Sequence, residues 1–169
     1  MLFPLRLIVV PDSEESLPNA TGEAHRRYGR MVTFREGWRG FLWPGWFKSY
    51  AMDEHYVVAA ARYIELKPVR GKWDKKAWEY PWSSARAHVE EKKNDGLVKV
   101  GPMIAMVGDW EKLLEEDATE DEAKKLRQHE RTGRPLGNEQ FVMRLEQLTG
   151  RRLRKRKPGP KGAGKMENK

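Results

Sequence analysis

The spacing of apolar residues along the chain predicts one short strand and a series of helices. The run from Leu5 to Pro11 is short, rich in β-branched residues and ended by proline, which is typical of a buried strand. Apolar residues at spacings of three and four predict a helix from about Asn19 to Val32. The segment from Phe34 to Tyr50 holds three Trp, three Gly and one Pro and keeps no helical period. We expect a compact aromatic loop or short strands there.

A further helix is predicted between Asp53 and Lys67. Asp53 is a good N-cap, and Pro68 ends the helix because it lacks a backbone donor and disfavours α conformation in the residue before it. We expect the apolar face of this helix to be buried. That face consists of Val57, Ala60, Ala61 and Ile64.

From Asp109 to Gly150 the sequence pattern is mainly helical. One helix is expected from Glu120 to Glu130, and another between its cap Asn138 and Gly150. Two helices joined by a Gly/Pro turn resemble a helix-turn-helix unit, although many helix pairs share this pattern without touching DNA.

Charge separates the last nineteen residues from the rest. Residues 151–169 hold nine Lys/Arg against Glu167, whereas the other 150 residues hold 24 basic and 24 acidic side chains, so the tail carries the whole net charge of +8. We expect this Gly/Pro-rich tail to be disordered when free and to bind a polyanion, most commonly nucleic acid. The alternative is a tail that only keeps the protein in solution. The residues assigned to DNA binding are Arg26, Arg27, Arg134, Arg151, Arg152, Arg154, Lys155, Arg156 and Lys157.

Composition excludes several classes of protein. The absence of cysteine excludes disulfides and thiolate metal sites and fits a cytoplasmic protein, which the basic tail would associate with the nucleoid. No run of about 18 apolar residues is present, so no membrane contact is expected.

Tyr63 stands out in the Asp53–Lys67 helix because small side chains, Ala59 and Ala60, lie near it in the sequence. A buried tyrosine is usually a core residue whose hydroxyl bonds a backbone carbonyl. Tyrosine can also act as a nucleophile that forms a covalent intermediate, and its attack on a phosphodiester needs a metal or a cationic clamp for the phosphate. The residues alone leave both roles open.

Three blocks of sequence around and after Tyr63 carry a resemblance to a known family. They read "GWRGFLWPGWFKSYAMDEHYVVAAARYIELKPVR", "YPWSSARAH" and "RTGRPLGNEQFVMRLEQLTGRRLRKRKPGPKG". In this order they resemble the single-tyrosine HUH transposases, in particular the branch of REP-associated tyrosine transposases. The resemblance covers about Leu5 to Gly162.

The resemblance implies an α+β fold. We expect a partial ferredoxin-like single-tyrosine transposase domain, followed by a helical C-terminal region and a disordered basic tail. The corresponding divisions are a truncated catalytic domain at residues 1–100, a helical and helix-turn-helix-like DNA-binding region at 101–150, and the tail at 151–169.

The family mechanism assigns Tyr63 the role of catalytic nucleophile. The equivalent tyrosine attacks a phosphodiester of single-stranded DNA, keeps a 5′-phosphotyrosine and releases a 3′-hydroxyl. Intact members use a divalent metal, Mg or Mn, held by a His-hydrophobic-His pair and a polar residue near the tyrosine. Here Pro4 and Arg6 occupy the positions of the two histidines and Lys67 that of the polar residue, so no metal ligand and no cofactor is expected in this chain. Arg6 could substitute for the metal as a cation.

The function implied is that of a transposase-like DNA-binding protein, whose family activity is metal-dependent cleavage and joining of single-stranded DNA in transposition. Whether this chain is an enzyme stays open. The alternatives are a non-catalytic DNA-binding module and a decayed transposase remnant. The expected partners are single-stranded or hairpin DNA and a second copy of the chain.

Overall fold

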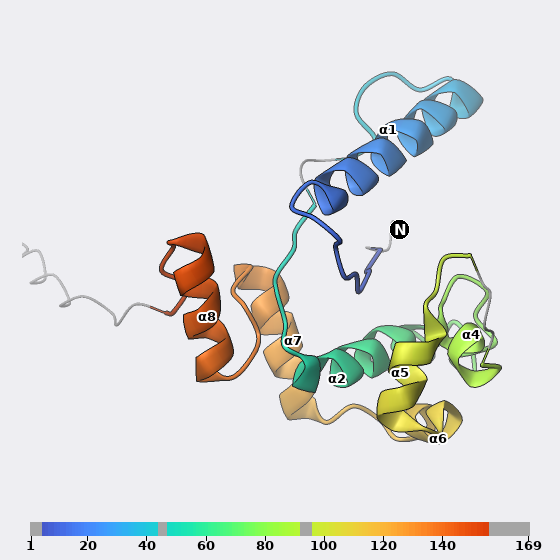
Figure 1. Cartoon of the computed structure of the whole chain (residues 1–169). Coiled ribbons are helices and arrows are strands. Elements are labelled where there is room, and N and C mark those ends of the chain that lie inside the picture. The colour runs from blue at the N-terminus through green and yellow to red at the C-terminus, as the bar shows by residue number, and fades with distance from the viewer. Residues whose placement is uncertain (1–4, 44–46, 92–95, 156–169) are drawn as a thin grey trace, which may run out of the picture.

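The computed structural model describes residues 5–43, 47–91 and 96–155, and these residues form eight helices (Figure 1). The helices are α1 (Ser16–Glu36), α2 (Glu54–Glu65), α3 (Lys67–Arg70), α4 (Ala85–Val89), α5 (Val100–Val107), α6 (Trp110–Glu115), α7 (Glu120–Thr132) and α8 (Glu139–Thr149).

The predicted α+β fold is wrong, because the described residues contain no sheet. Their only β pairing is an isolated bridge between Met52 and Leu136. The expected strand, Leu5 to Pro11, has no neighbouring strand, and its side chains from Leu7 to Val10 are exposed. A strand is defined by backbone pairing with a partner, and a β-branched sequence cannot supply that partner by itself. The partial ferredoxin-like domain is therefore not formed.

Helix α2 forms where the caps predict it. The Asp53 side chain accepts a hydrogen bond from the backbone N–H of Tyr56, as expected of an N-cap. The helix ends at Glu65, two residues before the predicted end, and the chain passes through Leu66 directly into α3. Pro68 lies in the first turn of α3, where a missing backbone N–H costs no hydrogen bond.

Helix α2 is the centre of the molecule, since α3, α5, α6 and α7 all contact it. Of the four residues predicted to be buried, Ala60 and Ala61 are buried, and Val57 and Ile64 are half-buried. These contacts join residues on both sides of position 100, where the sequence suggested a domain boundary.

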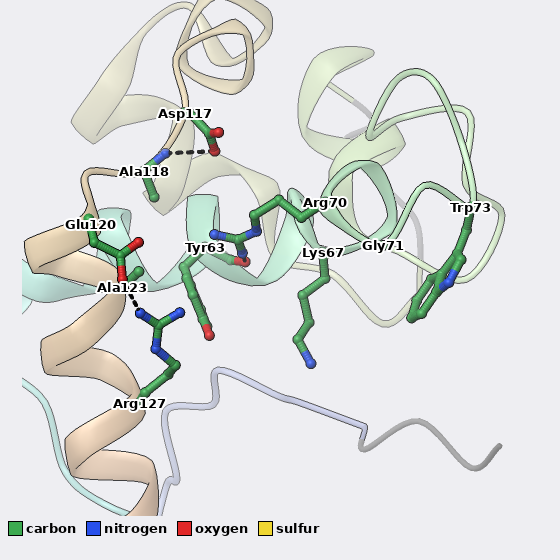
Figure 2. Close-up of a pocket in the computed structure, with 10 residues that line it drawn as sticks. All are labelled: Tyr63, Lys67, Arg70, Gly71, Trp73, Asp117, Ala118, Glu120, Ala123 and Arg127. Atoms are coloured by element: carbon green, nitrogen blue, oxygen red, sulfur yellow. Dashed lines mark hydrogen bonds and ion pairs between the residues drawn. The ribbon is translucent and has the colours of Figure 1, made fainter.

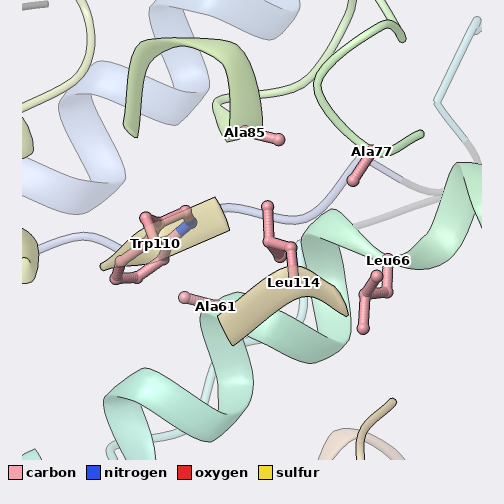
Figure 3. Packing of buried hydrophobic residues seen from close by; sticks show 6 residues of the cluster. All are labelled: Ala61, Leu66, Ala77, Ala85, Trp110 and Leu114. Carbon is pink, nitrogen blue, oxygen red and sulfur yellow. The ribbon is translucent and has the colours of Figure 1, made fainter. Parts of the chain in front are cut away.

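Two apolar clusters lie on different sides of α2. Figure 3 shows the first cluster, in which the Trp110 ring of α6 packs beside Ala61 of α2. Its buried members are Ala61, Leu66, Ala77, Ala85, Trp110 and Leu114. The second cluster joins α2 to α7, and its buried members are Ala60, Tyr63, Ala123, Leu126 and Leu136.

Helix α8 begins and ends at its predicted caps, and α7 continues to Thr132, two residues past its predicted end. The Asp109 and Asn138 side chains accept backbone hydrogen bonds at the starts of α6 and α8, and Gly150 ends α8 with a positive φ of 64°. Helix α8 nevertheless has no buried residue, and its Leu148 is exposed.

Candidate functional site

A cavity of about 460 Å³ lies between α2, α3 and the start of α7, and the predicted nucleophile Tyr63 forms part of its wall. The lining residues are Tyr63, Lys67, Arg70, Gly71, Trp73, Asp117, Ala118, Glu120, Ala123 and Arg127. The tyrosine is 8% exposed, and it belongs at the same time to the apolar cluster between α2 and α7. One side of its ring is therefore core, and the other side borders the cavity.

Cationic side chains surround Tyr63. The Arg70 guanidinium lies 4.3 Å from the centroid of the Tyr63 ring, and it donates a hydrogen bond to the Tyr63 carbonyl oxygen. In Figure 2 the Tyr63 hydroxyl and the Lys67 amine point to the same side of the helices, with Arg127 of α7 beside the tyrosine. Three cations from α3 and α7 thus line one cavity with the phenol.

Acidic residues offset part of this charge. The Arg127 guanidinium forms an ion pair of 2.5 Å with Glu120, which lies two turns earlier on α7. Asp117 also lines the cavity, and its carboxylate accepts a hydrogen bond from the backbone N–H of Ala118. The five ionisable side chains of the lining other than Tyr63 therefore leave it with an excess of one positive charge.

The environment of Lys67 disfavours its charged form. Burial lowers the pKa of the Lys67 amine below its ordinary value, and the nearby Arg6 cation lowers this pKa further. Glu130 acts in the opposite direction, and Arg70 adds to the lowering. Lys67 is thus closer to a neutral amine than an exposed lysine is.

The N-terminal segment approaches this site through Arg6. Its guanidinium forms an ion pair of 2.5 Å with Glu130 of α7. Burial raises the pKa of the neighbouring Tyr50 hydroxyl, the Glu130 charge raises it further, and Arg6 opposes both. Because Arg6 influences both Lys67 and Tyr50, it lies close to each. Arg6 therefore lies near Lys67, which lines the cavity with Tyr63, although the described residues form no sheet.

These residues do not fit the divalent metal of the transposase family. Within residues 5–43, 47–91 and 96–155, no group of three or more His, Cys, Asp or Glu side chains could hold a metal ion. Arg6 has no free lone pair to offer, and a protonated Lys67 would repel a cation, whereas Mg²⁺ prefers oxygen ligands. Pro4 lies outside the described residues.

The residues predicted to bind DNA lie in three separate places. Arg26 and Arg27 of α1 both pair with Glu23 at 2.8 and 2.5 Å, and these hydrogen bonds lower the pKa of Glu23 to about 2. Arg134 is half-buried in the connection between α7 and α8, where its carbonyl oxygen lies 2.8 Å from Nδ1 of His129.

The remaining predicted DNA-binding residues follow α8. Arg151, Arg152 and Lys155 are exposed. Arg154 instead returns to α8, since its backbone N–H and its side chain both donate to the Glu146 carboxylate. These hydrogen bonds, with one from the backbone N–H of Leu153, lower the pKa of Glu146 to about 2. Arg156 and Lys157 lie outside the described residues.

Sequence reasoning missed two of the cavity's cations. Arg70 lies seven residues after Tyr63, a spacing that puts two residues on the same side of a continuous helix. The sequence predicted that the helix would end before Pro68, so this signal was not used. Arg127 reaches the cavity only because α7 packs against α2, and no local pattern in the sequence indicates that contact.

Comparison of the chain with protein-family models, with curated proteins and with solved structures finds no match. Among the described residues, no helix is both long enough and apolar enough to cross a membrane.

Proposed function

We propose that the chain is a transposase-like DNA-binding protein whose Tyr63 cavity holds a backbone phosphate of single-stranded or hairpin DNA. The observation that supports this most directly is the convergence of Lys67, Arg70 and Arg127 on one cavity beside Tyr63. Guanidinium and ammonium groups are the side chains that bind phosphate, through charge-assisted hydrogen bonds. At about 460 Å³, the cavity is also larger than a phosphate group.

The roles within the cavity follow from the contacts of each cation. Arg70 is held against the Tyr63 ring and carbonyl, so it is a fixed wall of the site. The Lys67 amine makes no hydrogen bond or ion pair within the described part of the chain, so it is the group most available to a phosphate oxygen. Arg127 can contribute if it exchanges Glu120 for the phosphate.

Equilibrium binding of a fluorescent single-stranded oligonucleotide tests this function. Replacement Lys67→Gln should weaken binding about fivefold, because a charge-assisted hydrogen bond contributes about 1–3 kcal/mol. The matched control is Lys75→Gln, which removes the same charge at an exposed position outside the cavity. Equal losses in the two variants would contradict a phosphate site at Tyr63 and leave only general charge attraction.

A second candidate function is strand cleavage by Tyr63. It is favoured by the position of the phenol in the same cavity as a lysine whose pKa is lowered by burial. In this step the Tyr63 oxygen forms a bond to phosphorus, the bond from phosphorus to the 3′-oxygen breaks, and that oxygen leaves as a hydroxyl after gaining a proton. Lys67 in its neutral form can accept the phenolic proton. No metal takes part, because the donor set does not fit one.

Covalent adducts with labelled single-stranded DNA, detected after denaturing electrophoresis, test cleavage. The unaltered protein should form the adduct equally well with and without a chelator, and Tyr63→Phe should abolish it without loss of DNA binding. Tyr56→Phe on the same helix is the control and should form the adduct normally. An adduct that disappears with the chelator, or that survives in Tyr63→Phe, would contradict the step.

A further inference from the structure

Helix α1 and the loop after it expose aromatic side chains to solvent. In Figure 1 this helix stands apart from the cluster formed by α2, α4, α5 and α6, and Val32 is its only buried residue. Large apolar side chains left in water on one element often mark an interaction site. The exposed aromatic residues are Tyr28, Phe34, Trp38 and Phe41.

The loop is fixed against one side of the helix. The Trp43 ring stacks on His25 with centroids 4.3 Å apart, and its Nε1–H donates a hydrogen bond of 3.2 Å to the His25 carbonyl oxygen. Gly29 faces this tryptophan, and Gly37 allows the turn at the helix end with a φ of 64°. We call residues 23–43 the arm. It is a helix with its own returning loop.

The side of the helix opposite His25 and Gly29 carries both guanidinium and apolar groups. Arg27, Arg30, Met31 and Phe34 follow the spacing i, i+3, i+4, i+7 and therefore share one helical face. All four are exposed, and Phe34 is 90% exposed.

The arm is also basic. It holds five Arg and two Glu, a net charge of +3. The Arg30 guanidinium makes no hydrogen bond or ion pair within the described residues, so its charge is available to a partner. A partner of opposite charge is therefore favoured.

We propose that the arm is a stacking surface for the unpaired bases of single-stranded DNA, with Trp38, Phe41 and Phe34 meeting the bases and Arg30 the phosphates. This rests on the proposed function and adds a second contact, remote from the Tyr63 cavity. Exposed aromatic rings bind the faces of bases, and arginines follow the backbone. Base faces are accessible only in unpaired strands, so the arm selects a single strand over a duplex.

The test measures anisotropy of labelled strands with the full-length chain. One strand is a 20-mer of thymidine nucleotides, and the other has the same phosphates but abasic sugars. The unaltered protein should bind the first strand more tightly. The double variant Trp38→Ala, Phe41→Ala should bind it roughly fivefold or more weakly, because stacking contributes about 1–3 kcal/mol per base. Binding of the abasic strand should not change.

Trp82→Ala is the matched control, because Trp82 is 85% exposed but lies outside the arm. It should bind both strands as the unaltered protein does. Circular dichroism checks that each variant keeps its helices, and no loss is expected because the replaced side chains are exposed.

The remaining outcomes separate the arm from the cavity. If Lys67→Gln weakens binding of both strands while the double variant keeps its preference for bases, the arm is not a stacking surface and the proposed function stands. Failure of the unaltered protein to bind either strand overturns both. A double variant that changes only self-association in sedimentation, or a protein that prefers duplex or RNA, also overturns the proposal for the arm.

Discussion

Glu65 is a carboxylate that the fold removes almost completely from water, at 1% exposure. Its Oε1 accepts a hydrogen bond from the Ser84 hydroxyl and lies 2.7 Å from Nδ1 of His88. Its Oε2 accepts a hydrogen bond of 2.8 Å from the Trp110 indole. The His88 ring also lies against the Trp110 ring, with centroids 4.5 Å apart. A buried charge is tolerated only when such partners replace water. One side chain of α2 therefore ties α4 and α6 to the central helix.

Loss of this carboxylate should destabilise the whole helical cluster. In Glu65→Gln the NH₂ group of the amide replaces one carboxylate oxygen and cannot accept a hydrogen bond. At least one buried donor then loses its acceptor, and the free energy of unfolding should fall by about 2 kcal/mol. Urea unfolding followed by circular dichroism measures the change. Glu79→Gln, at an exposed position on the same part of the chain, should leave the unfolding midpoint unchanged. Equal midpoints for the two variants would mean that the buried network contributes nothing to stability.

At the scale of elements, Asp53 does more than start α2. One of its oxygens accepts from the Tyr56 N–H at 3.3 Å, and the other accepts from the Asn138 N–H at 2.9 Å. The backbone N–H of Asp53 itself donates to the Leu136 carbonyl at 3.0 Å. Asp53 therefore joins the start of α2 to the start of α8, 85 residues later in the chain.

Replacement Asp53→Ala should lower the free energy of unfolding by about 1–2 kcal/mol, because it removes an N-cap and leaves a second backbone donor without its acceptor. Thermal unfolding measures this effect. Asp12→Ala, at an exposed position before α1, is the control and should change the melting temperature little. If Asp53→Ala melted at the same temperature as Asp12→Ala, the cap and the link to α8 would contribute nothing to stability.

The sequence predicted helices better than it predicted the sheet. Caps such as Asp53 and Asn138 act on backbone groups within the next turn, so their effect is written in local sequence. Leu5 to Pro11 has a strand-like composition, but pairing depends on another segment being adjacent, and none is in the described residues. The same limit applies to the site. The local sequence drew attention to Tyr63 and a family resemblance to Lys67, whereas the position of Arg127 depends on how α7 packs.

At the scale of the whole molecule, three groups of positive charge differ in how much acidic charge accompanies them. The Tyr63 cavity is partly neutralised by Asp117 and Glu120, and the arm keeps a net charge of +3. The sequence after Lys155 holds five Lys/Arg against Glu167, a net charge of +4. The first two places offer defined side chains for contact, whereas a run of basic residues attracts any polyanion.

Truncation after Lys155 should therefore weaken DNA binding in a salt-dependent and sequence-independent way. It keeps Arg154 and its contact with Glu146, so the end of α8 is unaltered. Each cation that neutralises a phosphate of a single strand contributes about 0.7 to the steepness of log affinity against log salt concentration. Losing five such cations should therefore reduce this steepness by up to about 3.5. Anisotropy titrations at four or five salt concentrations give this slope.

A full-length variant with the same five basic residues replaced by glutamine separates charge from chain length. It should behave like the truncated protein, because counterion release depends on cations and not on the backbone that carries them. Lys67→Gln should instead reduce affinity at every salt concentration and lower the slope by at most about 1, since it removes one contact. A slope that is unchanged by truncation would mean that the tail does not touch DNA, and that the arm and the cavity account for all of the binding.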